Sequence, residues 1–440
     1  MSVSQQTSAA DARTPFITPA LILACGVVVA WCGVLIALKP DVIADERLHQ
    51  PVIAGVAEGR WPPARALVMP PTYHALLGAA SWLFGPSLAA SRAMTALLAV
   101  ATLLLIRATE RRLWPDEPDG QRALLAALNP LLLTYFALVY TETAALLLLA
   151  LACYFQARRS GWAAAAALTL ACLVRQSHLV WFGLLAVWAV EQRIRPDGKG
   201  SASSEVDGRR ANWFVRGRAW LIANQQALAP PLCGVLGVLM LYDLIGGMER
   251  GGSGLNKPRP NVAQIHIFGL SMGLLLMPIW MAGLWRDGRR RLMPGLRRPL
   301  GIGACLLAVG ILYQVFQSSH PFNNETDYLH NHVLRAMQRD GGVRALVCTL
   351  LAPVALGLWL DWRRQPRRRL LAWVWLFSAA YLALHWPVDP RYYIPVVLLL
   401  LLLARPTARV RGWMHVFNAA GVLAMATYVL ARGGPGGGVW

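Results

Sequence analysis

Charged residues are scarce in this sequence, and acidic ones are scarcest. Only 15% of the 440 residues are charged, while 56% are hydrophobic. An ordinary soluble domain carries about 25% charged residues. Apolar runs of roughly 17–25 residues, the length that crosses a bilayer, recur from one end of the chain to the other. We therefore exclude a soluble protein and predict an all-α polytopic membrane protein, a bundle of about 12–13 transmembrane helices with outer-face loops and short interfacial helices.

Metal-binding sequence patterns are also lacking. The seven cysteines are scattered, mostly inside apolar runs, and none belongs to a Cys-x-x-Cys or Cys/His motif. Cysteines of this kind are usually small buried hydrophobic residues. We therefore predict no metal site.

The basic residues outnumber the acidic ones by 42 to 22, which gives a formal net charge of +20. In a soluble protein this excess would suggest nucleic-acid binding. Here the arginines cluster in short segments between apolar runs, at 286–298, 363–369 and 405–411. Such clusters are typical of cytoplasmic loops. We predict a cytoplasmic N-terminus and no nucleic-acid partner.

The apolar runs divide the chain into a polar N-terminal tail (1–16), a transmembrane domain (17–431) and a C-terminal tail (432–440). The first run reads as an uncleaved signal anchor. Within the domain we expect an outer loop at 39–87 with a short interfacial helix at 72–86, a cytoplasmic loop at 193–226, an outer loop at 317–342, and two short helices with a turn in 161–192. Further spans are expected near 88–107, 121–138, 141–157, 228–246, 264–285, 299–316, 343–361, 371–386, 392–404 and 412–431.

The first outer loop contains Asp45-Glu46-x-x-His49, in which positions three and four apart share a helix face. A carboxylate at a membrane surface suits general-base chemistry, because partial desolvation raises its pKa. One alternative is an ordinary solvated loop. Another is ligation of a metal by His49 and Glu46, although the spacing supplies no third ligand.

Two later turns also carry charge. Arg175, in Arg175-Gln176-Ser177-His178, interrupts an apolar run and needs a partner or an anionic ligand such as a lipid phosphate. It could instead extend to the lipid headgroups. Glu142 lies at a turn between two apolar runs, where it could also simply cap a helix.

Two late outer loops concentrate histidines and acids. One contains His320-Pro321 and Asp327-x-x-His330, and the other is the very short Asp389-Pro390-Arg391-Tyr392-Tyr393. A short loop between spans holds its charges at a fixed depth beside the bilayer. Together the loops could form a pocket for a phosphorylated lipid, with Arg391 and a histidine neutralising the phosphate.

In this order the motifs resemble the dolichyl-phosphate-glucose α-1,2-glucosyltransferase family, the tenth in the asparagine-linked glycosylation series, of the GT-C class. The resemblance rests on Asp45-Glu46-x-x-His49, Glu58-Gly59, Trp61, Pro70-Pro71-x-Tyr73, Tyr140-Thr141-Glu142, Arg175-Gln176-Ser177-His178-Leu179-Val180-Trp181, His266, His320-Pro321, Asp327-x-x-His330 and Asp389-x-Arg391-Tyr392-Tyr393. The sequence departs from the family at Asn256-Lys257-Pro258, which replaces a more acidic segment, and at Asp389, which replaces a glutamate.

The resemblance implies a GT-C-like fold and an inverting transfer of a hexose, glucose in that family, from a polyprenyl-phosphate-sugar donor to a glycan or lipid-linked glycan. It implies no cofactor beyond that donor. Asp45 is the first candidate for the base and Glu46 the second. The donor phosphate and lipid would contact Arg175, Gln176, His330, Arg391 and Tyr392, and the acceptor or sugar would contact His49, Tyr73, Glu142, His266, His320, Asp327 and Asp389.

The composition, rich in alanine and arginine, is typical of a GC-rich bacterium, so we expect the plasma membrane with the site on the periplasmic side, or the endoplasmic reticulum membrane in a eukaryote. Two rival hypotheses are a transporter or flippase for a lipid-linked or anionic solute, and an oligosaccharide ligase that uses a lipid-pyrophosphate donor. A transporter predicts charges near mid-bilayer and related halves, neither of which is clear in the sequence.

Overall fold

The computed structural model describes residues 15–43, 45–60, 69–117, 119–194, 213–244, 259–286, 299–318, 320–324, 329–383, 385 and 387–431. These residues form helices and no β-strand, which confirms the predicted fold class. The α-helices are α2 (Pro19–Leu38), α3 (Glu46–Ala57), α4 (Thr72–Phe84), α5 (Leu88–Leu113), α6 (Gln121–Ala127), α7 (Pro130–Ala137), α8 (Thr141–Ala157), α9 (Gly161–Val174), α10 (Trp181–Ile194), α11 (Trp213–Leu244), α12 (Ala263–Leu275), α13 (Met277–Gly283), α15 (Pro299–Val315), α16 (Leu329–Arg339), α17 (Gly341–Trp362), α18 (Arg368–Ala383), α19 (Ile394–Leu403) and α20 (Ala408–Ala431). Short 3-10 helices are η1 (Gln176–Val180), η3 (Pro321–Asn324) and η4 (Pro390–Tyr393).

Four of the described helices are long and apolar enough to cross a membrane: α2, α5, α17 and the part Ile222–Leu244 of α11. Two sharply bent pairs, α7 with α8 and α12 with α13, bring the number to six if each pair is one span. Fewer described helices therefore meet the length of a span than the twelve or thirteen expected. The difference arises because several apolar runs are divided into shorter or bent helices.

The expected single span at 121–138 was wrong, since the structure divides it into α6 and α7. The division falls at Asn129-Pro130, where the Asn129 side chain accepts a hydrogen bond of 3.1 Å from the backbone N–H of Leu132. Proline at the first helical position has no N–H to leave unpaired. An asparagine cap followed by proline is thus a helix-start signal inside an apolar run.

Two loops expected from the sequence contain helices. The second half of the predicted loop 193–226 belongs to α11, and the predicted loop 317–342 contains η3 and α16. The helix–turn–helix expected in 161–192 is confirmed as α9, η1 and α10, and the short helix expected at 72–86 is α4. The tails 1–14 and 432–440, with the segment 256–258, lie outside the described residues.

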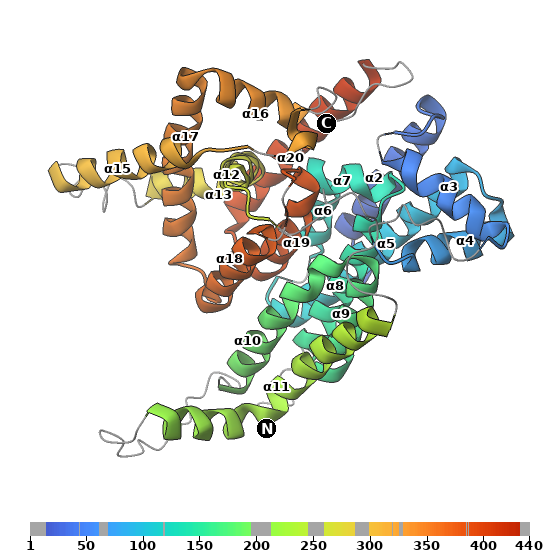
Figure 1. The fold of residues 1–440 in the computed structure, drawn as a ribbon, viewed down its shortest axis with the longest axis horizontal. Helices are drawn as coiled ribbons and strands as arrows, with labels where there is room; N and C mark the ends of the chain where they lie inside the picture. Colours follow the sequence, from blue (N-terminus) through green and yellow to red (C-terminus); the bar gives the residue numbers. More distant parts are fainter. Residues whose placement is uncertain are drawn as a thin grey trace.

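Helix α19 forms the centre of the bundle. All ten of its residues are buried, as expected for a helix that is hydrophobic on every side. In Figure 1 it lies between the blue-to-green helices of the N-terminal half and the yellow-to-red helices α12–α18 of the C-terminal half. Because η4 leads directly into α19, the residues of η4 are held at one end of this central helix.

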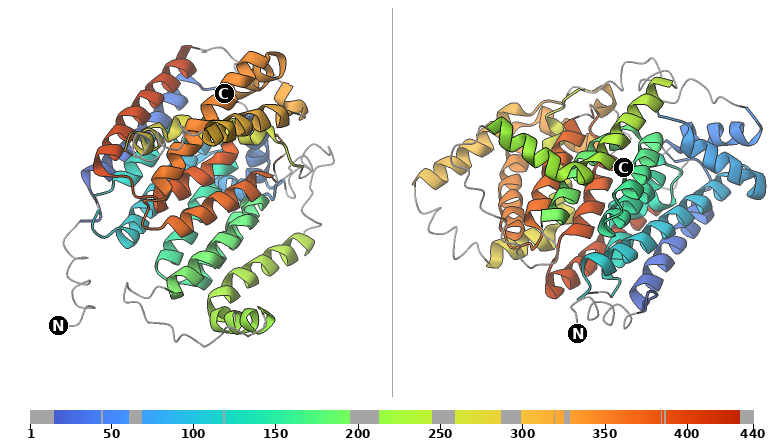
Figure 2. Two further views of the ribbon diagram at one scale, coloured as in Figure 1. Left: turned by 90° about the vertical axis from the view of Figure 1, so that its left-hand side faces the viewer. Right: turned by 90° about the horizontal axis from the view of Figure 1, so that it is seen from below.

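The ends of the bundle are defined by α5, which carries Arg92 in its first turns and is followed by Trp114. Arg92 and Trp114 are 22 positions apart, which corresponds to a helical rise of about 33 Å, close to the thickness of a bilayer core. The Trp114 indole donates a 2.9 Å hydrogen bond to the carbonyl of Leu402, at the far end of α19 from η4. We call these two ends the Asp45 end, where Arg92 lies, and the Trp114 end. Figure 2 shows that many helices of the bundle run roughly parallel to one another.

Small residues let helices approach closely in the C-terminal half. A Cβ atom added to Gly357 of α17 would collide with the carbonyl oxygen of Trp280 in α13, and one added to Gly283 would collide with the carbonyl of Gly357. Glycine at such crossings is typical of helix pairs in membranes, where close backbone approach replaces hydrophobic driving force.

Candidate active site

Arg391 is the centre of an ionic cluster at the Asp45 end. It lies on η4, and its guanidinium forms an ion pair with Asp45, a residue 346 positions earlier in the chain. Its Nε is also 2.9 Å from a carboxylate oxygen of Asp389 and 3.9 Å from one of Glu142. Asp389 in addition accepts a 2.9 Å hydrogen bond from the backbone N–H of Arg391, which fixes the short loop. The fold thus brings three predicted carboxylates to one arginine.

Arg175 supplies a second cation. It forms an ion pair with Glu142 and donates a 3.3 Å hydrogen bond to the hydroxyl of Thr141. Its guanidinium lies 5.5 Å from the centre of the Tyr392 ring, and that of Arg391 lies 5.4 Å from the same centre. Glu142 and Tyr392 therefore hold the two arginines together. A pair of guanidinium groups in one place matches the geometry of a phosphate.

Asp45 is the most exposed carboxylate of the cluster. Its side chain is 25% exposed, against 4% for Glu142 and 9% for Asp389. Burial raises the pKa of Asp45, but the Arg391 guanidinium outweighs burial and holds the pKa below its usual value. The backbone N–H of Asp45 donates a 2.9 Å hydrogen bond to the Tyr140 hydroxyl. Asp45 is thus ionised, anchored through its backbone, and open on one side.

Glu46 points in a different direction and is completely buried. Its carboxylate accepts hydrogen bonds of 3.0 Å and 2.5 Å from Arg92, which also donates to backbone carbonyls at the end of α2 and just after it. The same carboxylate accepts the backbone N–H groups of Ile43 and Val139, both at 2.9 Å. The Glu46 oxygens are therefore engaged within the protein, unlike the accessible oxygen that a general base needs.

The sharp turn between α7 and α8 is part of this arrangement. The two helices are bent by 113° across residues 138–140, which include Val139 and Tyr140. A bent helix pair leaves backbone N–H groups without helical partners. Glu46 bonds the free N–H of Val139, while Tyr140 reaches Asp45. The turn thus ties α3 and the first loop to the start of α8, where Glu142 lies.

An aromatic and histidine group lines the neighbouring side of α3. His49 lies 2.9 Å from His74 between two ring nitrogens, and its ring packs edge-on against Tyr73 and Tyr140. The Tyr73 hydroxyl lies 3.2 Å from the hydroxyl of Thr95. Burial lowers the pKa of His49 and lowers that of His74 to about 3, so both rings are neutral near pH 7.

The late loop approaches the cluster through Asn323. Its side chain donates a 2.9 Å hydrogen bond to the carbonyl of Val388 and accepts a 3.1 Å bond from the N–H of the same residue. Because Val388 directly precedes Asp389, this pairing fixes η3 beside the cluster. His320 and His330 are both buried, and their ring centres lie 6.3 Å and 6.0 Å from that of Phe322. His320 also accepts a 3.1 Å hydrogen bond from the Phe322 N–H.

Two of the remaining predicted residues lie within the described part of the chain, and the third lies outside it. Gln176 directly follows Arg175 at the start of η1. His266 lies apart: its ring nitrogens are 3.3 Å and 3.0 Å from the carbonyls of Val262 and Leu312, which links α12 to α15. Asp327 lies outside the described residues.

Sequence reasoning missed two contributors. Arg92 lies in an apolar helix, the same pattern that indicates a functional role for Arg175, and it binds the Glu46 carboxylate. His385 stacks on Tyr392 with ring centres 3.9 Å apart and thereby supports the ring that both arginines face. No local pattern around His385 indicates this stacking, because its partner is brought in by the fold.

An all-α bundle with membrane-spanning helices defines a polytopic membrane protein, and two arginines and three carboxylates form an ionic cluster at one end of it. The DIE2/ALG10 family profile matches residues 68–402, and the chain belongs to that family. The protein is accordingly a membrane glycosyltransferase. A search of curated proteins and a search of solved structures each returned no match.

The family match contains four members of the ionic cluster, namely Glu142, Arg175, Asp389 and Arg391, but it begins after Asp45. Asp45 is therefore linked to the matched region by its contacts in the folded structure and not by the family match. The ion pair with Arg391 and the bond to Tyr140 supply it.

Proposed function

We propose that the protein transfers a hexose, glucose in the first instance, from a polyprenyl-phosphate-sugar donor to a hydroxyl of a glycan or lipid-linked glycan. The observation that carries this proposal is the ion pair between Asp45 and Arg391 inside a cluster that also contains Arg175. In this cluster a partly exposed carboxylate lies beside two guanidinium groups at the Asp45 end of the helix bundle. Those are the charges that a base and a phosphate-binding site require.

The reaction would be a single displacement with inversion. Asp45 takes the proton of the acceptor hydroxyl, whose oxygen forms the new bond to C1 of the sugar. The bond between C1 and the phosphate oxygen breaks, and its electron pair leaves with the lipid phosphate. That leaving group is already an anion, so it needs stabilisation by cations rather than a proton. Arg391 and Arg175 would provide this stabilisation without help from a metal.

Binding of the donor would also change the pKa of the Asp45 carboxylate. In the structure Arg391 is shared among Asp45, Asp389 and Glu142. A phosphate that recruits Arg391 weakens its pairing with Asp45, which raises the pKa of the Asp45 carboxylate and makes it a better base. The donor thus prepares the base for the acceptor.

The other residues would support these steps. Glu46 would act as a positioning residue, because its oxygens are engaged by Arg92 and backbone amides. Glu142 and Asp389 would orient the arginines and the sugar hydroxyls. His330, Gln176 and Tyr392 remain candidates for the donor lipid phosphate. We place the site on the non-cytoplasmic face, opposite the arginine clusters.

The test is transfer by the purified protein in liposomes containing a synthetic polyprenyl-phosphate-glucose donor and a panel of glycan acceptors, with mass-spectrometric detection of product. Asp45→Asn should lower kcat by about 10²–10⁴-fold, the usual contribution of a positioned base. Glu58→Gln is the matched control, because Glu58 lies in the same loop with a side chain 51% exposed and paired with Arg60.

Full activity of Asp45→Asn would refute the role of Asp45. Movement of the intact lipid-linked sugar across the bilayer, without any covalent product, would instead support a flippase. Use of a pyrophosphate-linked donor in preference to a monophosphate would support a ligase.

A further inference from the structure

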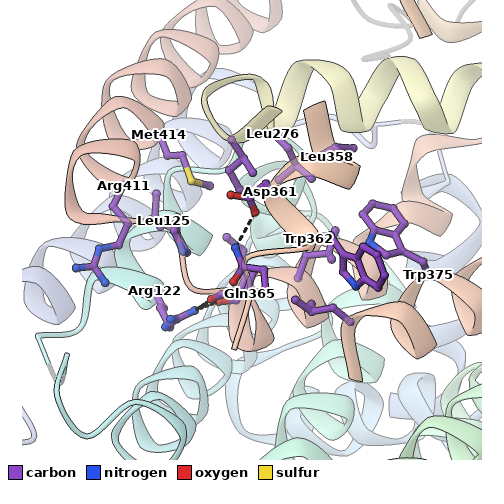
Figure 3. A pocket seen from close by; sticks show the side chains of 16 residues that line it. Arg122, Leu125, Leu276, Leu358, Asp361, Trp362, Gln365, Trp375, Arg411 and Met414 are labelled. Carbon is purple, nitrogen blue, oxygen red and sulfur yellow. Dashed lines mark hydrogen bonds between the residues drawn. The ribbon is translucent and has the colours of Figure 1, made fainter. Parts of the chain in front are cut away.

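Arg391 lies on a segment whose far end is firmly held. At the Trp114 end of α19, Arg122 donates hydrogen bonds of 2.5 Å to the carbonyls of Leu401 and Ala404 (Figure 3). Helix α19 cannot slide along its axis without breaking these bonds. The position of Arg391 therefore depends on the short loop 387–389, which directly precedes η4.

The backbone of this loop needs partners from elsewhere in the protein. Residues 387–389 lie outside any helix, and Val388 is completely buried. A buried backbone N–H or carbonyl without a hydrogen bond is costly. Two side chains from distant parts of the chain supply the partners, and both are buried carboxamides.

Asn323, on η3, pairs with both backbone groups of Val388, as a neighbouring strand would. Its Oδ1 accepts the Val388 N–H at 3.1 Å, and its Nδ2 donates to the Val388 carbonyl at 2.9 Å. The same Nδ2 donates at 2.9 Å to Asn331, whose own Nδ2 donates at 2.8 Å to the carbonyl of Phe322. Both asparagines are buried. The Asn323 carboxamide is thus held in one orientation.

Gln264, on α12, holds the same stretch of backbone from a different helix. Its Nε2 donates to the carbonyls of His385 and Pro387 at 3.2 Å and 2.8 Å. Its Oε1 accepts a 3.1 Å hydrogen bond from the hydroxyl of Tyr393, the last residue of η4. We call Asn323 and Gln264 the amide clamp, because together they hold the backbone that leads into η4.

The Arg391 side chain needs a fixed backbone because several acceptors compete for it. It is paired with Asp45 and Asp389, and its Nε is 3.9 Å from Glu142. A bound phosphate would be a further acceptor. A guanidinium bonds a phosphate through two parallel hydrogen bonds only when the two groups are in register.

We propose that Asn323 and Gln264 are positioning residues, which hold Arg391 at the place where it serves both Asp45 and the donor phosphate. This inference rests on the proposed function and adds to it two residues that carry no charge. Asn323 acts more directly, because Val388 adjoins Asp389, whose carboxylate accepts the backbone N–H of Arg391 at 2.9 Å.

The transfer assay in liposomes tests the proposal with Asn323→Leu, in which the side chain keeps its approximate size but loses every hydrogen bond. We expect kcat/KM to fall about 10²-fold, the cost of a misplacement of about 1 Å near the reacting groups. Asn324→Leu is the matched control, since Asn324 is the next residue of η3 and is exposed. It should keep the wild-type kcat/KM.

The pH profile separates positioning from general structural support. Arg391 holds the pKa of Asp45 below its usual value. If Arg391 is held less firmly, that pKa rises, and the fall of kcat/KM at low pH should move to higher pH by about one pH unit. Arg47, His49 and Tyr140 also face Asp45, and the substitutions leave them in place. Loss of structural support alone would lower the activity without this movement.

Two further variants keep the test decisive. Asn323→Gln retains the carboxamide on a longer side chain and should recover part of the activity. Gln264→Leu removes the bonds to His385 and Pro387 and should move the pH profile in the same direction, so it replaces Asn323→Leu if that variant does not fold. Wild-type kcat/KM in the leucine variants, or a lower value with an unmoved profile, would overturn the proposal.

Amide hydrogen exchange of the segment 387–393, followed by mass spectrometry, distinguishes failure of this inference from failure of the proposed function. The amides of Val388 and Arg391 should exchange faster in Asn323→Leu than in Asn324→Leu, whether or not the protein transfers sugar. A wild type without any transfer would refute the proposed function. Equal exchange in the two variants would overturn the clamp itself.

Discussion

At the scale of single residues, the main feature is a carboxylate whose strength as a base depends on one arginine. In the structure Arg391 holds the pKa of Asp45 below its usual value of 3.8. The kcat/KM profile reports the free protein, while kcat reports the complex with donor. A bound phosphate would weaken the Asp45–Arg391 ion pair and so raise the pKa of Asp45. We therefore expect the fall of kcat at low pH (its acid limb) to lie at a higher pH than the corresponding fall of kcat/KM.

Activity should rise with pH along both limbs, because the ionised carboxylate is the base. The measurement is initial rates across about pH 3–7 at low and saturating donor. Glu58→Gln should leave both limbs unchanged. Coincident limbs would show that the donor leaves the Arg391 pairing intact.

A second residue-scale prediction concerns the two buried histidines. Burial lowers the pKa of His74 from 6.5 to about 3 and also lowers that of His49. The unfolded chain takes up protons near pH 6.5 that the folded protein does not, so the stability is complete above that pH and is lost as the pH falls below it. We expect the Tm in detergent to decrease between about pH 7 and pH 5.

His74→Gln should reduce this decrease, because the substituted side chain does not titrate. His332→Gln, at an exposed position of α16, serves as the control and should leave the decrease unchanged. The comparison needs only thermal unfolding curves. A decrease as steep in His74→Gln as in the wild type would contradict the assignment.

At the scale of elements, the crossing of α13 and α17 depends on glycine. A methyl group on Gly357 would collide with backbone atoms of Trp280, so the two helices would have to separate. We expect Gly357→Ala to lower the Tm by several degrees, the scale of a change of about 1 kcal/mol or more in a helical domain.

Gly33→Ala is the matched control, since Gly33 lies in the long helix α2 and a Cβ added there meets nothing within 4 Å. Alanine favours a helix over glycine, so this variant should keep or slightly raise the Tm. Equal effects of the two substitutions would show that the crossing tolerates a wider spacing.

The elements also show what the sequence could predict. The sequence predicts Arg175 and Arg391 at turns between apolar runs, and the structure has them at the start of η1 and within η4, each with an acidic partner, as a charge in an apolar run requires. The division of 121–138 at Asn129 was missed although its cap signal is local. The pairing of Glu46 with Arg92 was not predictable in the same way, because it joins residues from separate helices whose packing decides which charges meet. Composition gives the class of fold, but not that packing.

At the scale of the whole molecule, the Asp45 end, which holds the ionic cluster, and the Trp114 end are opposite ends of a membrane-crossing bundle. We therefore expect cysteines introduced at Glu58 and Arg409 to react with a membrane-impermeant maleimide from opposite sides of intact vesicles. Both residues are exposed, one near each end. The parent protein, which has its own scattered cysteines, gives the background labelling. Labelling of both positions from one side would contradict the arrangement.

The sharp bend between α7 and α8 has a consequence for how the protein is made. The free N–H of Val139 is bonded by Glu46, which lies in the loop after the first span. An unpaired N–H costs several kcal/mol in lipid. The turn between α7 and α8 can therefore move from water into the bilayer at a low free-energy cost only after Glu46 has bonded this N–H. We expect the folding of the first loop to assist membrane insertion of α7 and α8 in this way. A Glu46→Gln chain captured during synthesis should then show a protease-accessible 138–140 segment for longer than the wild type does.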